Sequence, residues 1–319
     1  MKHKRKRASR QAAAAQGAFR KTYDKMAKDI LSMRNILAPV LKETVPEFYE
    51  LSIETIAKDC IEQGPWVGTI PVDPGMTNRY LRRRMTKKIR GLSTEQSEPY
   101  EGYVTFDLLF YARVPGTDKR IKLLINLEAQ RKRTNYKLVK RAVFYASRLI
   151  SSQKGRDFAG QDYDNICKVY TIWLCFYLPK GEKSSMTHYE FREVNDIGDH
   201  HASKSDYDLI NVTTIHVGND ENTAKLMRFL RLVFLSCLSE EAIAQKLKDE
   251  FGVETDDDTK KELRTMCNLS EGLIEESKIE AWAEAVKNLM KSMRLTAQQA
   301  IEAIAVPAQF REEVLDQIG

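Results

Sequence analysis

The sequence predicts an α/β fold, in which helices flank a mixed sheet and a helical region follows at the C-terminal end. Two runs rich in strand-forming residues, 103–113 and 121–130, surround the turn sequence Pro-Gly-Thr-Asp, which predicts a hairpin. A third run, 168–177, is apolar on both faces, as expected for a strand between two layers of helices. From Glu221 onward the apolar residues follow a helical period.

Before the hairpin, the sequence predicts a basic arm and two helices. Between Met1 and Lys28, Asp24 is the only acidic residue among many lysines and arginines, a composition that favours a disordered, polyanion-binding arm. Apolar residues from Ile30 to Leu41 have helical spacing, and Ser52 is placed to cap a second, short helix.

After the hairpin, helices and strands alternate before the chain becomes helical. We expect a helix over 135–153, strands at 168–177, 187–194 and 209–217, and then helices with an N-cap at Ser239 and a stop at Gly252. An acidic link, 254–262, leads to a helix over 271–293 and a shorter one opened by Thr296. The expected organisation is a basic flexible arm (1–27), a core (28–218) and a helical C-terminal region (219–319).

Each strand of the predicted hairpin carries a carboxylate, Asp107 on the first and Glu128 on the second. Glu128 and Gln130 share a face by the period of two. A register that sets Asp107 beside Glu128 gathers the oxygen ligands that Mg²⁺ requires. The alternative is that both are solvated residues on a half-exposed sheet.

The helix expected over 135–153 has two faces of different character. Arg141, Tyr145 and Arg148 follow one another at i, i+4 and i+7, and their guanidinium and hydroxyl groups are suited to binding phosphate. An ordinary solvated face is the alternative. The other face is an apolar stripe formed by Leu138, Val139, Ala142, Val143, Ala146, Leu149 and Ile150.

Asp107, Glu128 and Gln130 resemble the PD-(D/E)XK nuclease pattern, in which an aspartate precedes an acidic residue, any residue and a lysine. The sequences INLEAQ, YKLVKRAVFYASRLISSQ, VYTIWLCFYLP and MCNLSEGLIEE resemble the transposases of that nuclease family, which are related to the recombination-promoting nucleases. The resemblance extends from Lys28 to the C-terminus.

This resemblance implies a restriction-endonuclease-like core and a Mg²⁺-dependent DNA endonuclease that acts in recombination or transposition. Asp107, Glu128 and the carbonyl of Ala129 would bind the metal, with Mn²⁺ as an alternative ion, and Gln130 would orient the attacking water. Arg141, Tyr145 and Arg148 would face the scissile phosphate.

Gln130 departs from the wider pattern because it stands where many members have lysine. A neutral amide can orient a water but cannot carry a proton. Lys137 and Lys140 are candidates to contribute the missing charge. A further carboxylate often completes such sites, and the sequence offers Glu43, Glu54, Glu95 and Glu101 without choosing among them.

Composition narrows the class of protein. No apolar run reaches the roughly 18 residues of a membrane span, the N-terminus lacks a secretory pattern, and the five scattered cysteines fit free thiols. We therefore expect a cytoplasmic protein without a membrane partner. Basic clusters at 1–28, 82–90 and 131–141 predict DNA as the partner.

Two alternative functions stay open at this point. A catalytically inactive DNA-binding accessory protein on the same scaffold would explain the missing lysine. An effector that cleaves RNA would have a similar basic surface, because any phosphate chain is attracted to it. The sequence is compatible with a homo-oligomer.

Overall fold

The structure is a computed structural model of the 319-residue chain. It describes residues 25–62, 95–98, 102–105, 108–116, 122–130, 136–155, 157–178, 181–218, 220 and 224–318. The backbone alone is described for 95–98, 102–105, 122–130, 268–277 and residue 280.

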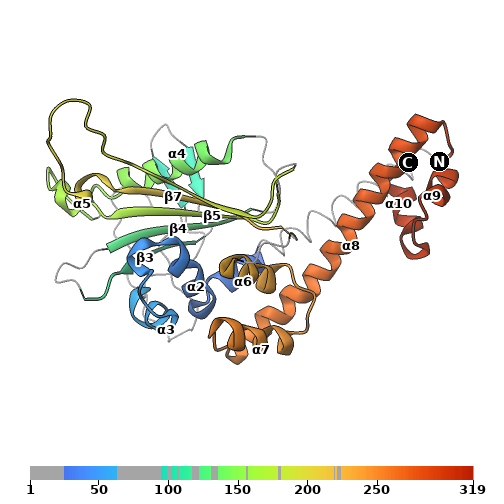
Figure 1. Cartoon of the computed structure of the whole chain (residues 1–319), viewed down its shortest axis with the longest axis horizontal. Helices are drawn as coiled ribbons and strands as arrows, with labels where there is room; N and C mark the ends of the chain where they lie inside the picture. The colour runs from blue at the N-terminus through green and yellow to red at the C-terminus, as the bar shows by residue number, and fades with distance from the viewer. Residues whose placement is uncertain are drawn as a thin grey trace.

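A mixed five-stranded sheet forms the centre of the molecule (Figure 1). Its order is β3-β4-β5-β7-β6, with β4, β5 and β7 parallel and the two edge strands antiparallel to their neighbours. The strand predicted at 168–177 is confirmed as the middle strand, and its side chains are buried on both faces. The strands are β3 (Leu108–Arg113), β4 (Lys122–Gln130), β5 (Lys168–Cys175), β6 (Ser185–Glu190) and β7 (Ile210–His216).

The predicted hairpin is present as β3 and β4, which pair antiparallel from Leu108↔Leu127 to Arg113↔Lys122. Gly116 in the connecting turn has φ +84°, a left-handed conformation that glycine adopts without steric cost. Because β3 and β4 are antiparallel, the chain reverses direction between them, as the turn residues predicted.

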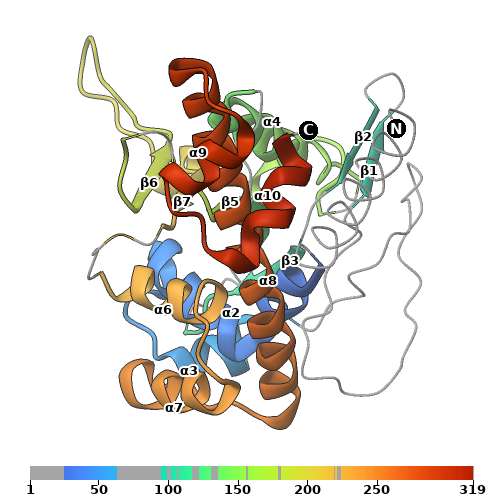
Figure 2. The same cartoon turned by 90° about the vertical axis from the view of Figure 1, so that its right-hand side faces the viewer.

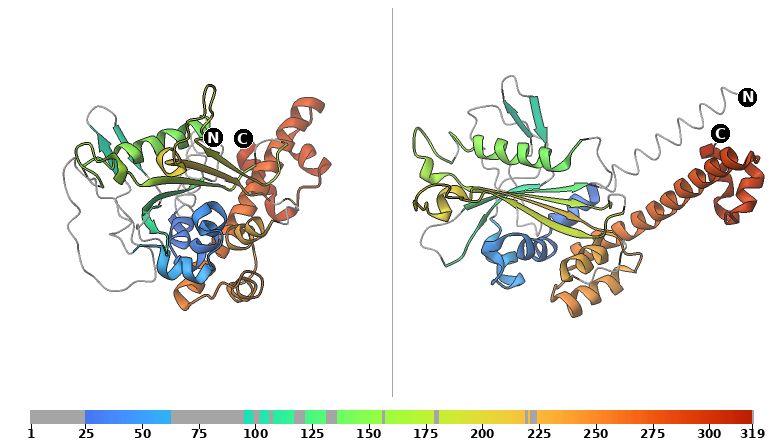
Figure 3. Two further views of the ribbon diagram at one scale, coloured as in Figure 1. Left: turned by 60° about the vertical axis from the view of Figure 1, so that its left-hand side comes forward. Right: turned by 45° about the horizontal axis from the view of Figure 1, so that its top comes forward.

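The first predicted strand is not continuous, and the expectation of one strand over 103–113 was wrong. β2 (Gly102–Thr105) pairs with β1 (Glu95–Glu98) in a separate two-stranded sheet, whereas β3 belongs to the main sheet. The small sheet lies on the side that helix α4 (Leu138–Ser151) covers (Figure 3). Alternating apolar residues fit both strands equally, so the pattern alone did not reveal where the chain changes sheets.

The two later strands extend the sheet as expected, with one difference at the outer edge. β7 occupies most of the predicted range 209–217. β6 begins two residues before the predicted range 187–194 and ends at Glu190, because its pairing with β7 runs only from Ser185↔His216 to Glu190↔Asn211. The pairing with β7 therefore sets the length of the edge strand.

Helices cover both faces of the main sheet. α4 packs on one face, against alternate residues of β3 and β5 such as Leu109 and Trp173. The N-terminal helices and α6 (Lys225–Phe234) pack on the other face and form the larger core with Phe110 and Tyr170. Figure 1 shows α4 above the sheet, and α2 (Arg34–Thr44), α3 (Ile53–Thr55) and α6 below it. This layered arrangement is the predicted α/β fold.

The N-terminal helices bring the predicted apolar stripe into the larger core. Ile36, Leu37, Val40 and Leu41 are fully buried, and the helix continues through Pro39 as expected. Ser52 caps the next helix by accepting the Thr55 amide hydrogen at 3.0 Å, as predicted. The elements are α2 (Arg34–Thr44), the 3₁₀ turn η1 (Pro46–Phe48), α3 (Ile53–Thr55) and the π-helical turn η2 (Ile56–Cys60).

The helix that follows α6 begins and ends at the predicted residues. Ser239 accepts the Ala242 amide hydrogen at the start of α7, and Gly252 ends that helix with φ +68°. Both α6 and α7 bury apolar residues in the larger core. The remaining elements of this part are η3 (Tyr163–Asn165), α5 (Lys204–Tyr207), α6 (Lys225–Phe234) and α7 (Glu240–Phe251).

The last part of the chain is built on one long helix, α8 (Asp257–Met293), of 37 residues. The prediction of an acidic link over 254–262 was therefore only partly right, because the non-helical part of that range ends at Asp256. Asp256 caps α8 by accepting the Thr259 amide hydrogen at 2.8 Å, and Asp257 and Asp258 stand in the first turn, where the helix dipole favours negative charge. The acidic residues from Asp257 onward therefore belong to α8, and the link between the two helices is shorter than predicted.

The far end of α8 carries a second, smaller core. Ala283 and Val286 of α8 pack with Ile301, Val306 and Val314. Figure 2 shows α9 and α10 gathered around this end of the helix. Thr296 forms a capping box with Gln299 at the start of α9, as the sequence predicted for a helix beginning there. The elements are α9 (Ala297–Ala303), η4 (Ala308–Phe310) and α10 (Arg311–Ile318).

The predicted division into 1–27, 28–218 and 219–319 stays a prediction. Most of the first segment lies outside the described residues. No helix within the described ranges combines the length and the apolar character that crossing a bilayer requires.

Candidate active site

The register of β4 locates the two predicted site residues on the second strand. Glu128 pairs with Trp173 of β5, and Gln130 pairs with Cys175, so both stand at the carboxyl end of β4. Ala129 lies between them, beside Leu174. The third predicted residue, Asp107, lies outside the described residues, directly before Leu108 in the sequence.

An arginine surrounded by aromatic rings lies on the α4 side of the sheet. The guanidinium carbon of Arg141 is 4.8 Å from the ring centroid of Tyr145 and 5.3 Å from those of Tyr136 and Trp173. Arg141 also donates hydrogen bonds to both tyrosine hydroxyls, at 2.5 Å in the case of Tyr145. Such contacts fix the orientation of a positively charged group.

Tyr145 and Arg148, the other two predicted residues of α4, are buried, with 6% and 4% of their surface exposed. The apolar stripe predicted for this helix is partly wrong, because Val143 is exposed to 46%. The face that packs on the sheet is rotated relative to that stripe, and it includes the aromatic ring of Tyr145, whose centroid lies 5.4 Å from that of Trp173. Large aromatic side chains on the strand favour this rotation.

A tyrosine on β3 ties the loop after α4 to the sheet. Tyr111 donates its hydroxyl hydrogen to the carboxylate of Asp157 at 2.7 Å. Tyr111 and Leu109 belong to the core on the α4 face. Sequence reasoning did not single out Asp157, because its partner is 46 residues away along the chain.

Cys175, at the carboxyl end of β5, has a fully buried thiol. Burial raises the pKa of Cys175 to about 12, so it stays protonated beside position 130. All five cysteines are free, as predicted.

The candidates for an additional carboxylate are distributed over different parts of the chain. Glu54 forms an exposed ion pair with Lys58 at 2.5 Å. Glu43 belongs to α2, on the face opposite α4. Glu95 begins β1, and Glu101 lies outside the described residues. In the part of the chain with described side chains, no group of three or more His, Cys, Asp or Glu residues could hold a metal.

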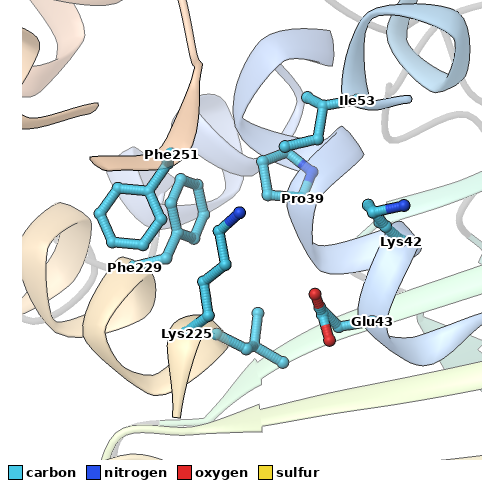
Figure 4. A pocket seen from close by; sticks show the side chains of 8 residues that line it. Pro39, Lys42, Glu43, Ile53, Lys225, Phe229 and Phe251 are labelled. Atoms are coloured by element: carbon cyan, nitrogen blue, oxygen red, sulfur yellow. The ribbon is translucent and has the colours of Figure 1, made fainter. Parts of the chain in front are cut away.

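The face opposite α4 carries a small hollow between α2 and α6 (Figure 4). Its polar groups are Lys42, Glu43 and Lys225, and apolar side chains complete it. Because α2 and α6 cover the face of the sheet opposite α4, this hollow is separate from the arginine site around Arg141. The apolar residues are Pro39, Ile53, Leu226, Phe229 and Phe251.

A second polar cluster occupies the amino end of β5. Lys168 Nζ lies 2.6 Å from Asp208 Oδ2 and 3.1 Å from Glu47 Oε1. Tyr170 donates its hydroxyl hydrogen to Glu47 at 2.5 Å, and burial together with that carboxylate raises the pKa of Tyr170 above its usual range. These charges satisfy one another, which is typical of a structural network.

The mixed sheet, covered by helices on both faces and with an acidic residue near the end of β4, defines a restriction-endonuclease-like fold. The family model of the PD-(D/E)XK nuclease family transposases matches residues 114–287, more than half of the chain. The chain belongs to that family. The matched range includes Glu128, Gln130 and Arg141 and begins after Asp107. No curated protein and no solved structure matched the chain.

Proposed function

We propose that this protein is a Mg²⁺-dependent DNA endonuclease that hydrolyses phosphodiester bonds, in recombination or transposition. The observation that supports this most directly is the antiparallel pair Leu108↔Leu127. If the same register continues by one residue, Asp107 stands opposite Glu128. Two carboxylates and the backbone carbonyl of Ala129 would then offer three oxygen ligands to one ion.

The chemistry of these ligands fits a hard cation. Mg²⁺ and Mn²⁺ prefer carboxylate and carbonyl oxygens, and Mg²⁺ sites in proteins use few protein ligands because the ion retains several waters. Bound there, the ion would lower the pKa of a water molecule and neutralise charge on the phosphate.

Gln130 is proposed to orient the attacking water. Its amide can donate and accept hydrogen bonds, but it cannot take a proton at neutral pH. Lys137 and Lys140, both exposed at the start of α4, are the alternative sources of charge. Because position 130 offers no general base, the proton would pass to solvent or to the phosphate.

Arg141, Tyr145 and Arg148 are proposed to bind the DNA backbone at the cleaved bond. Arg141 is the most accessible of the three, and its guanidinium is already oriented by Tyr136 and Tyr145. A fixed guanidinium binds two phosphate oxygens with little loss of entropy. Tyr145 and Arg148 are buried, so they would contribute from behind Arg141, Tyr145 through its hydrogen bond to that guanidinium and Arg148 through its positive charge.

The test is nicking of supercoiled plasmid in parallel with Mg²⁺, Mn²⁺ and EDTA. We expect cleavage with either ion and none with EDTA. Asp107→Ala and Glu128→Ala should abolish cleavage but retain most DNA affinity, because each removes a metal ligand and no basic group. Glu302→Ala, at an exposed position of α9, is the matched control and should cleave normally.

The same assay separates the alternatives. DNA binding that weakens with salt but does not depend on a divalent ion, without cleavage, would support an inactive accessory protein. Gln130, in place of the lysine of the wider pattern, is the reason to consider that alternative. Preferential cleavage of RNA would favour an effector. Full activity of Asp107→Ala or Glu128→Ala would contradict the proposed nuclease site.

A further inference from the structure

Trp173 has a buried hydrogen-bond donor that finds no acceptor in the described part of the chain. Its side chain is fully buried, and the indole Nε1 makes no hydrogen bond to any described group. Buried polar groups in proteins nearly always have a partner, so an exception requires an explanation. A fixed, unused N–H is a candidate for a contact made in another state of the protein.

The position of Trp173 beside Glu128 indicates that this other state is the metal-bound one. Trp173 is the register neighbour of Glu128 in the parallel pair of β4 and β5. It belongs to the core on the α4 face, and register neighbours lie on the same face of a sheet. Trp173 therefore belongs to the row of the sheet that also contains the proposed metal ligand.

The described groups around the indole ring do not supply an acceptor. Arg141 lies over the ring at 5.3 Å, and a guanidinium is only a donor. Tyr145, whose ring centroid is 5.4 Å away, already accepts a hydrogen from Arg141. Both neighbours bring positive charge or donors to the ring, so an anionic acceptor suits the site best.

We propose that Trp173 is a positioning residue for the metal site, and that its Nε1–H donates to the carboxylate of Glu128 when a divalent ion is bound. The inference rests on the proposed function. A carboxylate has two oxygens, so one can bind the ion while the other accepts a hydrogen bond. Hydrogen bonds from outside the coordination sphere hold metal-binding carboxylates in the orientation that the ion needs.

A fluorescence titration tests this contact in the native residue. The chain has three tryptophans, Trp66, Trp173 and Trp282. In the double variant Trp66→Phe/Trp282→Phe, emission comes from Trp173 alone. Titration with Mn²⁺ should change that emission, and the change should disappear in the same background with Glu128→Ala. A protein that binds Mn²⁺ by calorimetry without any change in Trp173 emission would overturn the proposal.

Substitution tests whether the N–H supports affinity. Trp173→Phe keeps an aromatic ring against Tyr145 but lacks the donor, and it should weaken Mn²⁺ binding by about tenfold, the lower range for such outer contacts. Thr171→Val is the matched control. Thr171 is also fully buried on β5 and its hydroxyl also has no partner among the described groups, but its register neighbour is Asn126. It should bind Mn²⁺ with unchanged affinity.

Thermal unfolding without metal separates a structural role from a positioning role. If Trp173→Phe lowers the melting temperature but binds Mn²⁺ like the wild type, Trp173 is only a core residue and the inference is wrong. If the wild type itself binds no divalent ion, the proposed function fails, which is a different outcome. The titration of native Trp173 decides the matter even where Trp173→Phe does not fold.

Discussion

Arg141 and Tyr145 form a charge-assisted hydrogen bond one helical turn apart, with Nη2 of the arginine 2.5 Å from the tyrosine hydroxyl. The ring of Tyr145 in turn packs on Trp173 of the central strand. The arginine is thus anchored to the sheet through a side chain of its own helix. Tyr145 therefore holds the guanidinium of Arg141 in place, and substitution of Tyr145 can test that role.

Tyr145→Phe should reduce the rate of DNA cleavage by about tenfold without loss of the fold. The ring remains packed, but Arg141 loses a hydrogen bond of a type that contributes about 1.5–3 kcal/mol. Steady-state kinetics on a short duplex would measure the effect, with Tyr163→Phe as control, since Tyr163 is exposed to 55%. Equal rates for the two variants would show that the hydroxyl does not serve Arg141 in catalysis.

Arg141→Lys should be almost as defective in cleavage as Arg141→Ala. A lysine keeps the charge, but it lacks the planar group that packs on three rings and binds two phosphate oxygens. Comparing the cleavage rates of both variants at saturating DNA checks this. A lysine variant close to wild type would mean that charge alone is sufficient.

Gln130→Ala should slow cleavage on the order of 100-fold, the lower range for removing one orienting hydrogen-bond donor from an active site. Metal affinity, measured by calorimetry, should persist because Asp107 and Glu128 are intact. Gln130→Lys should match or exceed the wild type if the residue orients water. An unaffected Gln130→Ala protein would remove Gln130 from the site.

Deleting residues 1–24 should weaken DNA binding and flatten its dependence on salt, while cleavage at saturating DNA changes little. Each lost phosphate contact lowers the slope of log affinity against log salt by about 0.9. Binding at several salt concentrations measures that slope. A matched control keeps the arm at full length with its lysines and arginines replaced by glutamine, and it should behave like the deletion.

The network at the amino end of β5 should be a strong determinant of stability. Lys168→Met leaves the buried carboxylate of Asp208 without its nearest cation, and we expect the free energy of unfolding to fall by about 3 kcal/mol. Urea unfolding measures this. The exposed pair of Lys58 and Glu54 is the control, and Lys58→Met should leave the urea midpoint unchanged.

Local sequence signals predicted much of the fold. The Pro-Gly turn and its flanking strands, the N-caps at Ser52 and Ser239 and the stop at Gly252 all depend on neighbours within a few residues. Such signals are readable in a single sequence because they do not require knowledge of distant contacts.

The signals that failed depend on contacts between distant segments. Residues 103–113 alternate like one strand, but β2 and β3 belong to different sheets. Val143 fits an apolar stripe, yet the ring of Trp173, about thirty positions later, draws Tyr145 to the buried face instead. The aromatic surroundings of Arg141 also combine a helix and a strand, so the sequence predicted a role for Arg141 but not for Trp173.

The long helix α8 carries two hydrophobic cores on one continuous backbone. Met266 belongs to the larger core and Ala283 to the smaller one, and the helix between them is about 25 Å long. The number of residues between the two cores therefore sets the direction in which α9 and α10, the C-terminal bundle, point away from the axis of α8. Inserting one residue in this stretch would turn the bundle by about 100° about the axis, whereas inserting seven would nearly restore its direction about 10 Å further out. Each inserted residue thus changes both the distance between the two cores and the rotation of one core relative to the other about the axis of α8.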